Sequence, residues 1–208
     1  MSKVPCLVLG IGNLLWSDEG FGVRAVEAFH ARYAMPENVS VVDGGTQGLY
    51  LLDPVCAAQH VLVFDAIDYD LPPGSLRVLR DAEVPTWSDT TMSLHQASFM
   101  ELLSLARLRG RFPQRITVIG VQPEVMDDLG GSLSAVVRER LDEAVGLAVA
   151  ELAGWGHLVT VRAAPPDEPL NAGALAMHAY EGERPAADAA FRLGDARFLN
   201  QVHAKEPG

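Results

Sequence analysis

The sequence predicts a single α/β domain over residues 1–160, with a twisted, mostly parallel sheet sandwiched between helices, and a C-terminal extension over residues 161–208. Three observations lead to this prediction. Short apolar runs alternate with longer segments of helical periodicity, which is typical of a parallel sheet covered on both faces. A glycine turn at Gly10 and Gly12 follows the first apolar run. The 208 residues, 49% of them hydrophobic, are enough for one sizeable core but not for a second full domain.

Each element is predicted from its periodicity and from the residues that interrupt it. Strands are expected where apolar and β-branched residues run together between turn residues, at 4–10, 39–42, 60–64, 75–79 and 115–121. The run at 75–79 alternates apolar and polar residues, which is typical of a half-exposed or edge strand. Helices are expected where apolar residues recur every three or four positions, at 19–33, 48–57, 95–109 and 132–153. A tight turn is expected at 43–46.

The composition changes near Trp155, and from Ala163 onward the chain is rich in proline, alanine, glycine and charge. Without sustained periodicity, this segment is predicted to be a tail rather than a domain. Short helices are expected around 173–180 and 186–191. The pattern leaves open whether they pack on the domain.

Charge and cysteine content restrict the function classes. The formal net charge of −11 argues against nucleic acid and anionic membranes as partners, and it allows a cation or a basic partner. Two cysteines, Cys6 and Cys56, indicate reduced thiols rather than a disulfide framework. No apolar run approaches the ~20 residues of a membrane span, and the first residues do not have the order of a signal peptide. A cytoplasmic location is therefore expected.

The glycine turn does not complete a nucleotide-binding motif. A dinucleotide site would need a third glycine where Leu15 stands and an acidic residue near 31–34, and Asp43 lies too far along the chain. The sequence also lacks a Walker lysine loop, a His-Glu-x-x-His zinc helix and a Gly-x-Ser-x-Gly nucleophile turn.

Three polar residues are expected to meet at one end of the sheet. Glu19 follows the first strand, Asp65 ends the third, and His95 lies at or just before a helix start. Two carboxylates and an imidazole suit a borderline divalent ion such as nickel or zinc, or the acid, base and orienting roles of a hydrolase. Each residue also has a purely structural interpretation, as a first-turn acid, a turn cap and a surface residue at a helix start.

Five motifs in order resemble those of the hydrogenase maturation endopeptidases, which process the large subunit of nickel–iron hydrogenases. They are Gly-Ile-Gly-Asn-x-Leu-x-x-Asp-Glu-Gly-x-Gly-Val at 10–23, Asp-Gly-Gly-Thr at 43–46, Val-Phe-Asp-Ala at 63–66, Ser-Leu-His at 93–95 and Gly-Val-Gln-Pro at 120–123. The resemblance extends from about Val4 to Ala153 and implies a single α/β domain with a twisted sheet.

The resemblance also implies an activity. Such an enzyme cuts one peptide bond and removes a short C-terminal peptide from the large-subunit precursor after nickel has been inserted. Glu19, Asp65 and His95 would contact that nickel, which belongs to the substrate, so no permanent cofactor is expected. Asp43 would take part in substrate selection or cleavage, and its alternative interpretation is a simple turn acid. The long C-terminus resembles the subgroup that serves uptake hydrogenases.

Two other functions fit the same residues. One is a nickel-binding assembly factor that escorts the large subunit without cutting it, and the other is a small-molecule hydrolase on the same fold. For the cut itself, a metal-activated water, a metal-polarised carbonyl and a carboxylate base all fit the residues.

Overall fold

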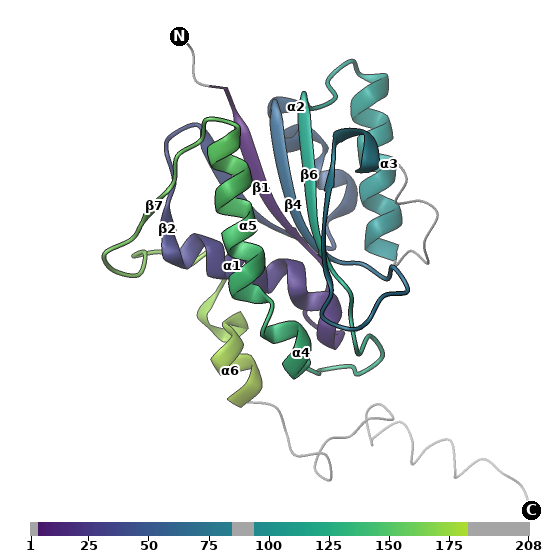
Figure 1. Ribbon diagram of the computed structural model, residues 1–208, viewed down its shortest axis with the longest axis vertical. Coiled ribbons are helices and arrows are strands. Elements are labelled where there is room, and N and C mark those ends of the chain that lie inside the picture. The colour runs from purple at the N-terminus through teal and green to yellow at the C-terminus, as the bar shows by residue number, and fades with distance from the viewer. Residues whose placement is uncertain (1–3, 85–93, 183–208) are drawn as a thin grey trace, which may run out of the picture.

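The computed structural model describes residues 4–84 and 94–182, apart from the side chains of 94–98. A five-stranded sheet with the order β3-β1-β4-β6-β5 forms its centre (Figure 1). All neighbouring pairs are parallel except β5 with β6. The strands are β1 (Cys6–Ile11), β3 (Val39–Gly45), β4 (His60–Ala66), β5 (Leu76–Arg80) and β6 (Arg115–Val121). The predicted fold class is confirmed, and so is the edge position of the strand near 75–79.

Helices cover both faces of this sheet (Figure 1). They are α1 (Phe21–Arg32), α2 (Leu52–Ala57), α3 (Leu94–Leu108), α4 (Ala135–Arg138), α5 (Leu141–Gly154) and α6 (Met177–Gly182). Short 3-10 helices are η1 (Ser17–Gly20), η2 (Gly48–Leu51) and η4 (Gly173–Leu175). A separate ribbon pairs β2 (Tyr33–Ala34) with β7 (Thr160–Val161). No helix in 4–84 or 94–182 has both the length and the apolar character to cross a bilayer.

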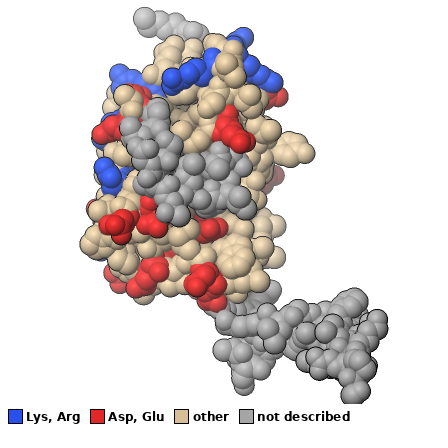
Figure 2. All heavy atoms as spheres, turned by 90° about the vertical axis from the view of Figure 1, so that its right-hand side faces the viewer, with Lys and Arg blue, Asp and Glu red and all other residues tan. Residues whose placement is uncertain are grey.

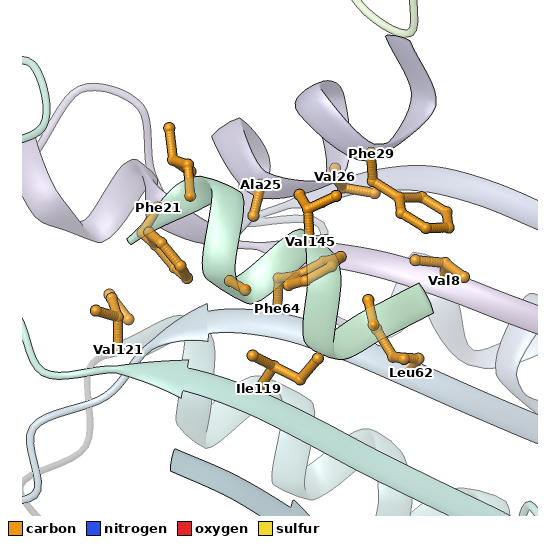
Figure 3. Close-up of a cluster of buried hydrophobic side chains, with 14 of the residues drawn as sticks. Val8, Phe21, Ala25, Val26, Phe29, Leu62, Phe64, Ile119, Val121 and Val145 are labelled. Carbon is orange, nitrogen blue, oxygen red and sulfur yellow. The ribbon is translucent and has the colours of Figure 1, made fainter. Parts of the chain in front are cut away.

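Two apolar clusters hold the helices to the sheet, one on each face. On one face α1 and α5 pack on alternate residues of the central strands, as Figure 3 shows for Phe21, Phe29 and Phe64. On the other face, α2 and α3 pack on the intervening residues, including Val61 and Val63. Because successive residues of a strand face opposite sides, neighbouring residues of β4 belong to different cores.

Glycines allow α1 to lie directly on the backbone of two strands. A Cβ built on Gly22 would lie 2.1 Å from the Ile11 carbonyl oxygen of β1 and 2.2 Å from that of Phe64 in β4. A Cβ on Gly10 would lie 2.3 Å from the Gly22 carbonyl oxygen. Gly22 therefore permits the close helix–strand approach that a third glycine at position 15 would serve in a dinucleotide site.

Two local predictions were wrong. The helix expected at 132–153 is divided at Glu139 and Arg140 into α4 and α5. The tight turn expected at 43–46 is partly strand, since β3 continues to Gly45, although Gly45 has the expected positive φ of 44°. The sequence left open whether the segment after Ala163 packs on the domain, and in the structure this segment contacts the core through Leu170 and Met177. The helix expected at 186–191 lies outside the described residues.

Candidate active site at the carboxyl end of the sheet

The four parallel strands end together, and we call this side of the molecule the carboxyl end of the sheet. The loop after β1 is held there by its own polar groups. Asn13 Oδ1 accepts the Leu15 N–H at 3.0 Å, and the Gly12 N–H reaches the Gly45 carbonyl at 3.1 Å. This loop leads into η1, which carries the paired acids Asp18 and Glu19.

Asp18 is a structural residue. It is fully buried, and its carboxylate accepts bonds from the main-chain N–H groups of Glu124 and Val125 at 2.8 Å each. It also accepts the Ser134 N–H at 2.7 Å and the Ser134 hydroxyl at 2.9 Å. A carboxylate with four donors has little capacity left for another ligand. Asp18 thus fastens the loop after β6 to η1.

Glu19, the next residue on η1, is half-exposed, whereas Asp18 is buried. Its helix contacts the end of β4, which carries Asp65. The sequence does not distinguish these two adjacent acids, whereas the structure gives them different surroundings. Asp18 is committed to the fold, and Glu19 remains accessible at the carboxyl end of the sheet.

Asp65 is fully buried at the end of β4, and its Oδ1 accepts the Ala66 N–H at 2.8 Å. It faces the α3 side of the sheet, since Val61 and Val63 on the same strand belong to that core. Tyr69 lies near enough for the Asp65 charge to contribute to raising the pKa of its phenol, although burial is the main cause. The charge of Arg77, whose guanidinium lies 5.0 Å from the centre of the Tyr69 ring, opposes that rise.

His95 lies in the first turn of α3, and its side chain is outside the described set. One helical turn later Phe99 is buried, and it lines a small cavity with Ile11 and Gly45 at the ends of β1 and β3. Positions four apart share a helix face. The backbone therefore brings position 95 to the same end of the sheet as Glu19 and Asp65.

Asp43 also lies at this end, but on the opposite face of the sheet from Asp65. It pairs with Gly10, and Gly10 pairs with Phe64 in the α1-side core, so Asp43 faces α1. Its Oδ1 accepts the Gly45 N–H at 2.8 Å. Burial raises the pKa of the Asp43 carboxyl, and the nearby Glu27 adds to the rise. Hydrogen bonds from Asn171 and Gly45 and the charge of Arg24 oppose it.

No three His, Cys, Asp or Glu side chains among those described form a metal site. Because the side chain of His95 is not among them, the set of Glu19, Asp65 and His95 remains a prediction. Its donors are two carboxylates and one imidazole without a thiolate, a combination that suits moderate binding of nickel or zinc. Burial raises the pKa of the Cys6 thiol to about 12, so Cys6 does not supply a nucleophile.

Two further residues explain the fifth motif. Gln122 is buried, and its Oε1 accepts the N–H groups of Tyr69 and Leu71 at 2.7 and 3.2 Å, which fixes the loop after β4. A Cβ on Gly120 would lie 2.8 Å from Ile67 Cδ1 and 3.2 Å from the Tyr69 hydroxyl. Sequence reasoning assigned no role to Gln122 or Tyr69, and the only signal was the position of the motif at a strand end.

Charge is distributed unevenly over the molecule. In the face shown in Figure 2, acidic side chains gather over the lower half, and Lys and Arg gather mainly at the upper end. Acidic residues follow the ends of β4 and β6, at Asp68, Asp70, Glu124, Asp127 and Asp128. The carboxyl end of the sheet is therefore acidic, which favours a cation or a basic partner.

A family model described as hydrogenase maturation protease matches residues 23–151. The hydrogenase expression/formation protein HupM of Azotobacter chroococcum is 49% identical over 201 residues, covering 96% of each chain. HoxM of Cupriavidus necator, described in the same words, is 48% identical and covers 94% of this chain and 98% of its own. The hydrogenase 2 maturation protease of Escherichia coli is 40% identical over 66% of this chain.

A solved structure leads to the same group. The hydrogenase maturating endopeptidase HybD of Escherichia coli superposes with a TM-score of 0.73 and 37% identity, over 76% of this chain and 98% of its own. The fold and the sequence thus point to the same set of proteins.

Proposed function

The chain belongs to the hydrogenase maturation protease family and is a peptide hydrolase of hydrogenase maturation; from this premise we propose that it removes a short C-terminal peptide from the nickel-loaded large-subunit precursor of a nickel–iron hydrogenase. In this proposal Glu19, Asp65 and His95 contact the nickel of the substrate, and the protease holds no metal of its own.

One observation supports the assignment of the site: η1, β4 and α3, which contain the three residues, lie together at the carboxyl end of the sheet. The 3-10 helix with Glu19 contacts β4, in which Asp65 is the last residue but one, and His95 is the second residue of α3, one turn before the buried Phe99. Ligands of open α/β sheets bind at this end because the loops after parallel strands gather there.

The proposed chemistry follows from the residue types. Two carboxylates and an imidazole supply additional ligands to a metal ion that is already bound to the substrate. That metal would polarise the scissile carbonyl or activate the attacking water, and a carboxylate that does not bind the metal would take the proton of this water and pass it to the leaving amine. Asp18 is excluded as that base, because four donors already occupy its carboxylate.

We assign the substrate to an uptake-type hydrogenase and the enzyme to the cytoplasm. HupM and HoxM support the first assignment, since their matches span nearly the whole of both chains and so include most of the C-terminal extension. Both cysteines are free thiols, which supports a reducing compartment.

The test is a mass measurement on the precursor. Nickel-loaded precursor is mixed with the purified protein at roughly one-twentieth of the precursor concentration. The intact mass of the precursor is then followed with time. We expect complete shortening by the mass of one C-terminal peptide, and no shortening of nickel-free precursor. An unchanged mass of folded, nickel-loaded precursor would refute the proposal, and an unchanged mass together with a stable one-to-one complex would indicate the non-cutting escort instead.

A further inference from the structure

Tyr69, in the loop after β4, has a phenol hydroxyl that is buried although its ring is only partly covered. The ring packs on the apolar cluster of the α3 face. No atom in the described part of the chain forms a hydrogen bond with this hydroxyl. A buried polar group without a partner costs free energy of folding, so such a group in a native protein calls for an explanation.

The hydroxyl of Tyr69 lies beside Asp65. A Cβ built on Gly120 would lie 3.2 Å from the hydroxyl oxygen, and Gly120 of β6 is the register partner of Asp65 in β4. Register partners present their side chains on the same face of a sheet, on strands about 4.8 Å apart. Both positions lie on the α3 face, because Val63 and Val118, two residues earlier in each strand, belong to that core. The hydroxyl therefore lies where a side chain at position 120 would extend, next to the Asp65 carboxylate.

The phenol is held in this direction by its backbone and by its ring. Gln122 Oε1 accepts the Tyr69 N–H at 2.7 Å, and Gln122 Nε2 donates to Asp68 Oδ1 at 3.0 Å. The guanidinium carbon of Arg77 lies 5.0 Å from the centre of the Tyr69 ring, within the range of a cation–π contact. A donor that is fixed before its ligand arrives loses little further freedom on binding.

The two neighbouring groups differ in what they can bind. An ionised carboxylate only accepts hydrogen bonds or ligates a cation, whereas a phenol is protonated at neutral pH and can donate. A peptide carbonyl next to Asp65 alone would face another acceptor. With the hydroxyl of Tyr69 at the same place, it would meet a donor.

We propose that Tyr69 is a substrate-binding residue, whose hydroxyl donates a hydrogen bond to a main-chain carbonyl oxygen of the precursor beside Asp65. The inference rests on the proposed function for the nature of the ligand, a polypeptide. The phenol keeps its proton, and no bond other than this hydrogen bond forms. The fifth motif then has a role in binding, because Gly120 leaves room for the hydroxyl and Gln122 fixes the loop that carries it.

The experiment compares two substitutions in the full chain that each remove one phenol hydroxyl and keep the ring. Tyr69→Phe removes the proposed donor, and Tyr33→Phe is the matched control, since Tyr33 packs on the α1 face of the sheet. With nickel-loaded precursor, we expect Tyr69→Phe to raise KM by about tenfold and to leave kcat near the wild-type value, because the bond is made as soon as the precursor binds. Tyr33→Phe should keep both values.

The melting temperature separates a role in binding from a role in the fold. Because no described residue bonds to the hydroxyl, its removal should leave the Tm of Tyr69→Phe at or above that of wild type. A lower Tm together with an unchanged KM would show that the hydroxyl serves the fold, and would overturn the inference. An unchanged KM at any Tm, or an equal rise of KM in both variants, would also overturn it.

Failure of the proposed function is distinguishable from failure of this inference. If wild-type protein leaves the nickel-loaded precursor uncut, the proposed function fails, and the affinity for the uncut precursor is measured by calorimetry instead. Binding that is about tenfold weaker in Tyr69→Phe than in wild type would then support the role of Tyr69. Equal affinities, or no binding by wild type, would overturn it.

Discussion

The two ends of the sheet are built from different chemistry. At the carboxyl end, glycine loops and carboxylates lie at the surface, and Asp18 holds the loops with four accepted hydrogen bonds. At the opposite end, which we call the amino end, two buried imidazoles bond to each other, with His60 Nδ1 and His157 Nε2 2.9 Å apart. Asn38 Nδ2 lies 3.0 Å from His157 Nδ1 and also donates to the Val4 carbonyl at 2.7 Å.

The amino end is closed by neutral groups. Because the Asn38 amide nitrogen can only donate, His157 Nδ1 accepts, and we assign the proton of His157 to Nε2, which donates to His60. Burial lowers the pKa of both imidazoles, and for His60 the charges of His157 and Arg115 lower it further while Asp81 opposes this. The two ends therefore differ in their buried polar groups: a buried carboxylate holds the loops at the carboxyl end, and neutral imidazoles and an amide bond to one another at the amino end.

The largest effect should come from the carboxyl end. Asp65→Asn, Glu19→Gln and His95→Ala should each lower kcat/KM for precursor processing by about 1,000-fold, or about 4 kcal/mol, with Tm close to wild type. Asp127→Asn removes an exposed carboxylate from the same end and serves as the control, with activity near wild type. Normal processing by all three site variants would end the assignment of the site.

Substitutions of the adjacent acids Asp18 and Glu19 should differ in how much they lower the free energy of unfolding. Asp18→Ala should lower the free energy of unfolding by about 3 kcal/mol, because four donors lose a buried acceptor. Glu19→Ala should change it by about 0.5 kcal/mol or less. Urea denaturation of the two variants measures both values. Similar losses in the two variants would contradict the division of roles within the pair.

At the amino end a substitution should affect stability and leave catalysis intact. His157→Ala deprives His60 and Asn38 of a partner and should cost about 2 kcal/mol of unfolding free energy. Processing per folded molecule should equal that of wild type. A loss of kcat/KM comparable to that of the site variants would show that the two ends are not separable.

The smallest effect is a pH dependence that belongs to the same imidazoles. Their folded pKa values are lowered, so below the unfolded-state pKa near 6.5 the unfolded chain binds more protons. Their contribution to stability is thus complete above about pH 6.5 and is lost progressively as the pH falls. We expect Tm to decline over this range in wild type and to decline less in His157→Ala. Parallel Tm profiles for the two proteins would exclude the pair as the source.

The sequence predicted the elements of the sheet well, because their signals are local. Both faces of β4 are buried, so Val61 to Phe64 form a continuous apolar run in the sequence. The alternation of apolar and polar residues in 75–79 identified the strand at the edge. Glu19 and Asp65 were placed at the correct end of the sheet by the strands they follow. The meeting of His95 with them stays a prediction.

Other features depend on contacts that a single sequence does not contain. Asp43 lies at the same end of the sheet as Glu19 and Asp65, but only the strand register shows that it is on the opposite face from Asp65. Asp18 and Glu19 look alike in the sequence, and only the loop after β6 distinguishes them. The segment after Ala163 has no sustained periodicity, and its attachment depends on separate contacts, such as those of Leu170 and Met177 with the core and that of Glu181 with Arg138.

Gly22 has a mechanical consequence. Because no layer of side chains separates α1 from β1 and β4 at this point, a displacement of the helix must carry both strands with it. The elements that hold Glu19 and Asp65 accordingly have no hinge at this contact that would let the distance between the two residues change. A substitution of Gly22 by any larger residue would therefore push α1 away from both strands and change the distance between Glu19 and Asp65.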